Sequence, residues 1–326
     1  MKTLIALSGL VLVLFAASLL IGPAAIGVPD QLRALLAGEG EAVVLVMREI
    51  RLPRALLGLM VGAALGLSGA AMQGYLRNPL AEPGLIGVSP AASLGAVLAM
   101  QTGLAAAFAP ALPLAALLGA GLSVGLLFVL AGPRGGALTL ILAGVALSAL
   151  AGALTSLVLS LSPNPFAVAE IVFWLMGSLA DRSMLHVWLA APVMAVGVLL
   201  LLGTGRGLDA LTLGEDAAAA LGIPVRRLRA QVVLGVAALV GAATAVAGAV
   251  GFVGLVVPHV LRPLVGGRPA ALLPVSALGG AAVVLAADIA TRVIAPDRDL
   301  KLGVLTAIVG APFFFHLIFR MRRGLE

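Results

Sequence analysis

Long apolar runs, separated by short groups of charged residues, prolines and glycines, make up most of the chain. A run of about 20 apolar residues can cross a bilayer as an α-helix, and continuous rather than alternating runs exclude a transmembrane β-barrel. We therefore expect an all-α polytopic membrane protein with about ten transmembrane helices, in a single transmembrane domain over residues 1–326. The predicted spans are 4–26, 52–75, 84–107, 111–131, 136–160, 187–203, 230–249, 251–266, 270–291 and 302–319.

One further apolar segment, residues 165–180, contains Glu170 and is followed by Asp181 and Arg182. At about 16 residues it is too short to span a bilayer comfortably. We expect an interfacial or re-entrant helix there.

Composition and charge agree with this class. The chain is 62% hydrophobic and only 10% charged, with a mean hydropathy of +1.19 and a net charge of +6. With both termini cytoplasmic, the inner ends of the spans collect twelve of the 20 basic residues but five of the 14 acidic ones, Glu82 among them. This is the positive-inside pattern, so the basic charge does not indicate nucleic-acid binding. The chain has no cysteine, which excludes disulfides and thiolate metal sites.

The first run also fits a signal peptide. Its removal would leave an odd number of spans and would place the N-terminus on the side opposite the basic C-terminus. Parity therefore favours a first transmembrane helix.

An internal repeat appears when the chain is shifted by 179 residues. The shift needs no gap, and it matches Val61–Ala64 with Val240–Ala243, Gly69 with Gly248, Pro79 with Pro258, and Gly87 with Gly266. Five spans separate the second helix from the seventh, so the copies, residues 52–160 and 230–319, should run in opposite directions. Spans 2–5 and 7–10 then form an inverted repeat, which is a transporter architecture.

The second span also carries a stripe of small residues at every fourth position. It consists of Gly58, Gly62, Gly66, Ala70 and Gly74. Such a stripe favours close packing against another membrane helix.

The energy source for transport is predicted to lie outside the chain. There is no Walker A motif, and no predicted span carries a charge well inside it. Asp288 and Arg292 lie four residues apart at an outer end, and we expect them to pair on the helix surface. The inner loop 203–231 contains a short helix signature, which indicates either a membrane-surface helix or a docking surface for another protein.

Several motifs along nearly the whole chain resemble one family, the permease subunits of ABC importers for vitamin B12, haem and iron siderophores. They are Arg51-Leu-Pro-Arg54, Arg77-Asn-Pro-Leu-Ala-Glu-Pro83, Leu85-Ile-Gly-Val-Ser89, Gly177-Ser178, Leu213-Gly-Glu215, Leu221-Gly222, the stretch from Gly251 to Arg262, Asp288, Arg292 and Gly310-Ala-Pro-Phe313.

This resemblance implies a transport subunit, not an enzyme, in a bacterial inner membrane. The implied partners are a second copy of the chain, two ATPase subunits that carry ATP and Mg²⁺, and a periplasmic binding protein that delivers a metal chelate. The chain itself would bind no metal or cofactor.

The resemblance also assigns residues. Arg51, Arg54 and Arg292 fall on outward arginines that dock the binding protein, unless Arg54 or Arg292 only reaches to the interface or pairs with Asp288. The ATPase coupling segment matches Leu213, Gly214, Glu215, Asp216, Ala217, Ala220, Leu221 and Gly222.

The fifth span is implied to be a pathway helix. It carries small residues at four-residue spacing, namely Gly144, Ser148, Gly152, Ser156 and Ser160. Such a stripe can line a path or pack against a helix. An inner hinge is expected before it, at Pro133, Arg134, Gly135 and Gly136.

The cargo is less sharply defined. The stretches 73–87 and 173–178 look closest to the haem and siderophore branches of the family. An iron chelate is therefore expected, with vitamin B12 as an alternative. A stand-alone secondary transporter is the alternative from another class.

Overall fold

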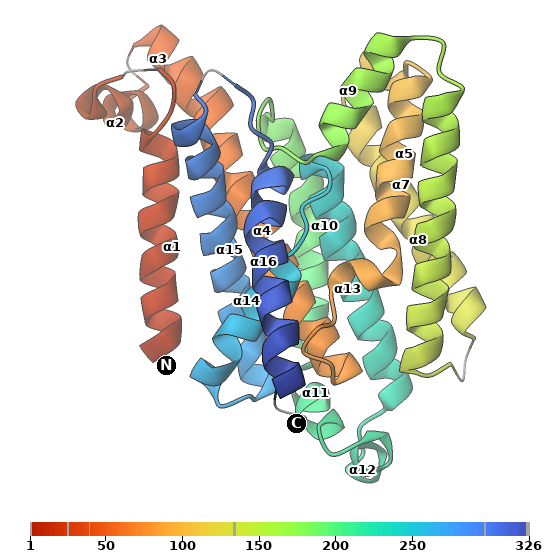
Figure 1. Cartoon of the computed structure of the whole chain (residues 1–326). Coiled ribbons are helices and arrows are strands. Elements are labelled where there is room, and N and C mark those ends of the chain that lie inside the picture. The colour runs from red at the N-terminus through yellow and green to blue at the C-terminus, as the bar shows by residue number, and fades with distance from the viewer. Residues whose placement is uncertain (1, 25, 39, 133–134, 297, 324–326) are drawn as a thin grey trace.

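The computed structural model describes residues 2–24, 26–38, 40–132, 135–296 and 298–323 (Figure 1). Within these ranges every regular element is helical. The elements are α1 (Lys2–Leu20), α2 (Val28–Leu36), α3 (Glu41–Leu45), η1 (Val46–Arg51), α4 (Leu52–Leu76), η2 (Pro83–Ile86), α5 (Val88–Gln101), α6 (Leu104–Ala107), α7 (Ala111–Ala131), α8 (Ala137–Ser160), α9 (Pro165–Leu175), α10 (Met184–Leu202), α11 (Gly205–Leu211), α12 (Glu215–Ala220), α13 (Val225–Ala247), α14 (Val253–Leu261), η3 (Arg262–Val265), α15 (Pro269–Ile294) and α16 (Leu302–Arg323).

Seven of the described helical stretches are long and apolar enough to cross a membrane. They include α1, α4, α7, α8, α10, α13 and α15. Four shorter apolar stretches, α5, α9, α14 with η3, and α16, accompany them, and this confirms the all-α polytopic prediction. The eleven-residue α9 is too short to cross, as expected for residues 165–180. The predicted span 84–107 is interrupted, since it forms η2, α5 and α6.

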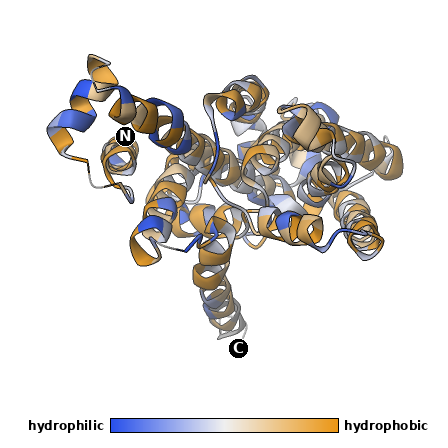
Figure 2. Ribbon diagram, turned by 90° about the horizontal axis from the view of Figure 1, so that it is seen from above, coloured by the Kyte–Doolittle hydropathy of each residue, from blue (hydrophilic) through white to orange (hydrophobic). Residues whose placement is uncertain are grey.

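Burial divides the bundle into a core and a periphery. Helices α4 and α13 are buried over most of their length, whereas α7, α8 and α10 have only about a third or less of theirs buried. Seen from above, α16 extends away from the other helices toward the C-terminus (Figure 2). Its exposed side chains include Ile308, Val309 and Phe315, which are apolar. The periphery is therefore made for contact with lipid or with another apolar protein surface.

The stripe of small residues in α4 packs as predicted. A Cβ atom added at Gly66 would lie 2.0 Å from the carbonyl oxygen of Ser276 in α15, and one added at Gly280 would lie 2.1 Å from that of Gly62. Farther along α4, a Cβ at Gly69 would lie 1.9 Å from the carbonyl oxygen of Gly254. Backbones approach this closely only where side chains are missing.

The two halves of the chain run in opposite directions. Helix α4 runs toward the end of the bundle where α12 lies, and α13 runs away from it (Figure 1). Helices α8 and α16 are opposed in the same way. This is the arrangement that the internal repeat predicts.

The two copies differ just after Gly248, although the shift of 179 residues holds again at η2 and η3, which end at the matched left-handed glycines Gly87 and Gly266. Helix α4 continues past the matched Gly69 to Leu76, but α13 ends at Ala247. Gly248 has φ +71°, and a Cβ there would lie 2.4 Å from the carbonyl oxygen of Trp174. The chain therefore leaves the helix at this residue, and helix α14 begins only at Val253.

Replacing Gly66 by valine tests the close crossing of α4 and α15. We expect Gly66→Val to lower the thermal unfolding midpoint of the purified protein in detergent, because an overpacked core position costs about 1–3 kcal/mol. Gly125→Val in α7 is the matched control, since nothing lies within 4 Å of a Cβ added there. Equal midpoints for the two variants would contradict the close crossing.

Candidate functional site

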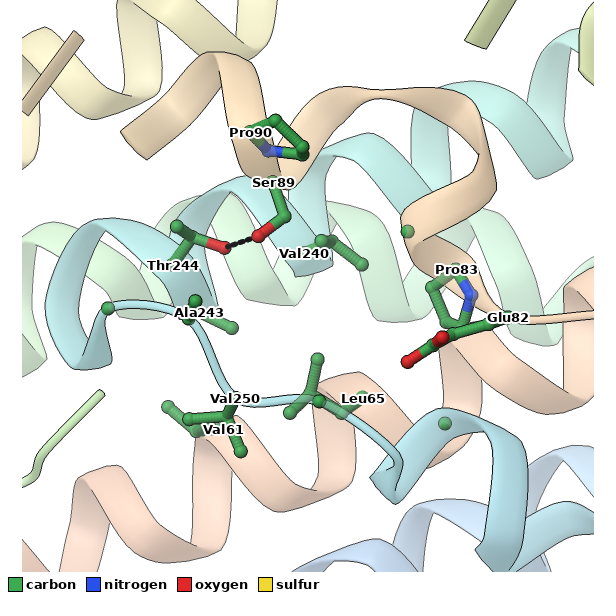
Figure 3. Close-up of a pocket in the computed structure, with 15 residues that line it drawn as sticks. Val61, Leu65, Glu82, Pro83, Ser89, Pro90, Val240, Ala243, Thr244 and Val250 are labelled. Atoms are coloured by element: carbon green, nitrogen blue, oxygen red, sulfur yellow. Dashed lines mark hydrogen bonds between the residues drawn. The ribbon is translucent and has the colours of Figure 1, made fainter. Parts of the chain in front are cut away.

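A cavity of about 210 Å³ lies between the two halves of the chain (Figure 3). Both halves contribute to its wall. The lining residues are Val61, Leu65, Glu82, Pro83, Gly84, Ser89, Pro90, Val240, Ala243, Thr244, Gly248, Ala249, Val250, Gly251 and Gly254. The cavity therefore sits where α4, the start of α5, the end of α13 and the start of α14 meet.

Two interrupted segments form much of this wall. Residues 77–82 and 248–252 are not helical. The first segment begins at the exposed Arg77 and ends at Glu82, and Glu82 lines the cavity together with Gly248, Ala249, Val250 and Gly251. In a membrane protein, such backbone is tolerated only where it is enclosed by protein or lines a cavity. The two breaks in the helices therefore coincide with the wall of the cavity.

Glu82 joins the two segments. The backbone N–H of Phe252, which precedes the first turn of α14 and has φ +66°, donates a hydrogen bond to Glu82 Oε1 at 3.1 Å. The carboxylate thus satisfies a donor at the positive end of a helix. Glu82 ties the first half of the chain to the second.

A hydroxyl pair lies across the cavity. Thr244 Oγ1 of α13 donates to Ser89 Oγ at the start of α5, at 3.0 Å. Together with Glu82, these are the polar side chains in a wall that is otherwise apolar or made of glycine backbone. Among the described residues, no group of three or more His, Cys, Asp or Glu side chains could hold a metal ion.

A charged cluster lies at the end of the bundle opposite α12. Asp288 is only 1% exposed, and its carboxylate contacts Arg54 Nη2 and Arg292 Nη2 at 2.9 Å each. The predicted pairing of Asp288 with Arg292 is confirmed, as is the alternative that Arg54 pairs with Asp288. The predicted surface location is wrong, because Asp288 and Arg292 are both buried. A buried carboxylate between two guanidinium groups holds α4 and α15 together at this end.

Two arginines fix the end of α1. Arg51 is buried and donates to the carbonyl oxygens of Leu19 and Leu20 at 3.1 and 2.9 Å. Arg292 donates to the carbonyl oxygens of Ser18 and Ile21 at 2.9 and 2.6 Å. Cations at the last carbonyls of a helix satisfy orphan acceptors.

The inner loop protrudes from the opposite end of the bundle (Figure 1). Leu213 and Leu221 flank α12 and are 70% and 64% exposed, while Ala218 is buried beneath them. Asp209 of α11 anchors the loop, since its Oδ1 accepts from the Ala270 N–H at 2.8 Å and its Oδ2 from Arg268 Nη2 at 3.1 Å. Glu215 and Asp216, in the first turn of α12, are exposed as well. The result is a tip that combines two exposed leucines with two carboxylates, on a fixed base.

Known proteins share this arrangement. A family model described as the FecCD transport family matches residues 10–320. The chain belongs to the FecCD transport family.

Relatives and solved structures agree. The chain is 42% identical over 90% of its length to the Fe(3+) dicitrate transport system permease protein FecD of Escherichia coli (strain K12), covering 92% of that protein. It is 41% identical over 86% of its length to the cobalamin import system permease protein BtuC of Halobacterium salinarum, covering 75% of that protein. A solved structure described as an inward-facing conformation of a metal-chelate type ABC transporter has a TM-score of 0.88 and 34% identity, with 98% of this chain and 99% of that chain covered.

In this FecCD-family chain, the small-residue stripe of α8 divides in two. A Cβ at Gly144 would lie 2.0 Å from the carbonyl oxygen of Leu85, so the inner end of the stripe packs against η2. Ser148 is half-buried, whereas Gly152, Ser156 and Ser160 are exposed. Helix packing thus accounts for Gly144, and pathway lining stays a prediction for the outer residues.

The predicted hinge lies partly outside the described residues, since these omit Pro133 and Arg134. Gly135 accepts a hydrogen bond through its carbonyl oxygen from Arg229 of α13. Gly136 directly precedes α8. The hinge itself stays a prediction.

Sequence reasoning missed the polar residues of the cavity. It placed Glu82 on the inner side, whereas the structure places it beside Phe252 within the bundle. The helix break at Gly248 could have located Glu82. The break leaves a new helix start at Val253, and the N–H groups there need an acceptor such as a carboxylate. Glu82 and Ser89 both lie in motifs of the family resemblance, but those motifs assigned them no role. Thr244 carried no signal, because single hydroxyl residues are common in membrane helices.

Glu82 can be tested by two substitutions. Glu82→Ala removes the acceptor for the Phe252 N–H and should cost about 1 kcal/mol, as loss of a helix cap does. Glu82→Gln keeps a carbonyl oxygen at the same place and should retain most of that stability. Thermal unfolding in detergent separates the two variants, and an equal loss in both would mean that the negative charge, not the hydrogen bond, is what matters.

Asp288→Asn tests the outer charged cluster. It leaves two guanidinium groups without a countercharge, and we expect a loss of about 3 kcal/mol, as when one partner of a buried ion pair is removed. The control Asp299→Asn changes an exposed carboxylate at the same end, and its effect should stay within about 0.5 kcal/mol. Thermal midpoints that match between the two variants would show that the cluster does not stabilise the fold.

Proposed function

We propose that this chain is the transmembrane permease subunit of an ATP-binding-cassette importer. It moves an iron chelate, haem or a ferric siderophore, from a periplasmic binding protein into the cytoplasm. The observation that carries the proposal is the protruding tip around α12, with exposed Leu213 and Leu221, at the end of a FecCD-family bundle opposite a cluster of arginines.

The tip suits docking to an ATPase. Two leucines, Leu213 and Leu221, stand exposed on either side of α12, and α11 holds the loop against α15 through Asp209. A tip with exposed leucines on a fixed base can both bind a partner and pass on its movement. ATP and Mg²⁺ belong to two separate ATPase subunits, and this chain hydrolyses nothing.

The exposed periphery suits a second copy of the chain. Helix α16 stands away from the bundle with Ile308, Val309 and Phe315 outward, and the outer half of the α8 stripe is open. In a homodimer, one translocation path can run between the two copies. Gly152, Ser156 and Ser160 would line it with small uncharged groups, which let a bulky chelate pass without strong binding.

The outer arginines suit docking of the binding protein in unequal ways. The side chain of Arg54 is 19% exposed, so it is the accessible member, and its planar guanidinium can bind a carboxylate of the partner beside Asp288. Arg51 and Arg292 are committed to α1 and Asp288 within the chain. Arg51 and Arg292 could dock the binding protein only if these contacts within the chain broke. Otherwise they contribute by holding the elements around Arg54 in place.

Orientation follows from charge. The start of α1, the end of α16 and the α12 loop lie at the same end of the bundle (Figure 1). The excess of basic residues predicted for that end supports a cytoplasmic location for it, with the protein in the inner membrane of a bacterium.

Two alternatives differ in what supports them. Cobalamin is an alternative cargo, since a cobalamin permease is similar over most of the chain. A stand-alone secondary transporter is favoured by one feature, the carboxylate of Glu82 in the central cavity. Its hydrogen bond to Phe252 gives that carboxylate a structural role, and the α12 tip has no use in such a transporter.

The double variant Leu213→Glu with Leu221→Glu tests the docking of the ATPase. Placing two charges at an apolar contact should abolish co-purification of the partner ATPase and ATP-driven uptake, while the permease stays folded. Leu36→Glu is the control, because Leu36 is 84% exposed on α2 at the opposite end. Unchanged ATPase binding in the double variant would sink the proposed coupling site.

A further inference from the structure

A pocket of about 440 Å³ lies at the cytoplasmic end of the bundle, between the end of α7 and the start of α13. Its walls combine basic and apolar groups. The lining residues are Phe128, Gly132, Arg226, Arg227, Arg229 and Ala230. Half of them are arginines, and none is acidic.

The three arginines are not equivalent. Arg229 donates hydrogen bonds to the carbonyl oxygens of Gly135 and, at 3.3 Å, of Gly132, so it fixes the loop between α7 and α8. Arg226 and Arg227 are exposed, and neither pairs with a carboxylate among the residues that the structure describes. Two guanidinium groups therefore point from the pocket wall with their donors available.

The local backbone adds to the positive potential. Arg226 and Arg227 lie in the first turn of α13, a helix of 23 residues without a side-chain cap. Its first N–H groups carry the positive end of the helix dipole. A negatively charged group would be stabilised there by both the side chains and the helix.

The pocket lies at the depth where the apolar surface of α7 ends. Val129 and Leu130, in the last turn of α7, are 76% and 56% exposed and face outward as apolar side chains. Phe128 extends this surface into the pocket. A ligand with an anionic head and an apolar tail fits both parts, and such a ligand is present at this depth in every bacterial membrane leaflet.

We propose that this pocket binds the phosphate group of an anionic phospholipid of the cytoplasmic leaflet. Arg226 and Arg227 donate to the phosphate oxygens, and the acyl chains follow the surface of α7 beside Phe128. The bound lipid links the α7–α8 loop to α13, the helix that follows α12. The site stands on the pocket itself and does not depend on the transported cargo.

Binding can be measured on the purified full chain. Native mass spectrometry in detergent should show phosphatidylglycerol bound more tightly than phosphatidylcholine with the same acyl chains, by roughly tenfold or more, as two arginines at an anionic surface provide. Arg226→Gln with Arg227→Gln should bring the two lipids within about twofold of each other. Arg206→Gln is the matched control, an exposed arginine on α11 outside the pocket, and should keep the preference.

Further arms separate the competing explanations. Arg226→Lys with Arg227→Lys retains the charge and should retain the preference, which excludes a folding defect as the cause. If inorganic phosphate bound as tightly as the lipid, the pocket would instead be a site for free anions. An unchanged lipid preference in the double glutamine variant would overturn the proposal. If that variant lost only the binding of the ATPase, the two arginines would be a protein contact instead, which would also overturn it.

Discussion

Close approach of helix backbones in the bilayer is the constraint on which the structure depends. Lipid tails are as apolar as leucine side chains, so burying apolar surface gives membrane helices little reason to associate. Association instead comes from packing, and glycines at Gly62, Gly66 and Gly280 bring α4 and α15 into backbone contact. The buried ion pairs of Asp288 fasten the same two helices at their outer end. The core is therefore rigid, and the open helices α7, α8 and α16 surround it.

A rigid core can carry movement over a distance. Helix α13 begins just after the α12 loop, and its far end reaches the cavity at Thr244 and Gly248. The interrupted segment that follows is held by Glu82 from the other half of the chain. Under the proposed function, a displacement of α12 by an ATPase reaches the cavity through one continuous helix. The opposite direction of the two halves places the cavity between elements that can move against each other.

Much of this fold could be predicted from the sequence, because membrane helices must satisfy their own hydrogen bonds and must be long enough to span. The runs of apolar residues gave the helices, and the spacing of Gly62 and Gly66 gave the packing face. Long-range side-chain partners could not be obtained in this way. The pairing of Arg54 with Asp288 could be named only as an alternative to docking, because the two residues lie far apart in the chain and only the crossing of α4 and α15 shows that they meet. Glu82 was misplaced for the same reason, since its partner is a backbone N–H in the other half.

Uptake of a labelled ferric chelate into sealed proteoliposomes tests the central claim most directly. The vesicles would contain this chain with or without its partner ATPase, with the binding protein outside and ATP inside. The proposed function predicts concentrative uptake only when the ATPase and ATP are both present. Equal uphill uptake by the chain alone, driven by a proton or sodium gradient, would contradict it.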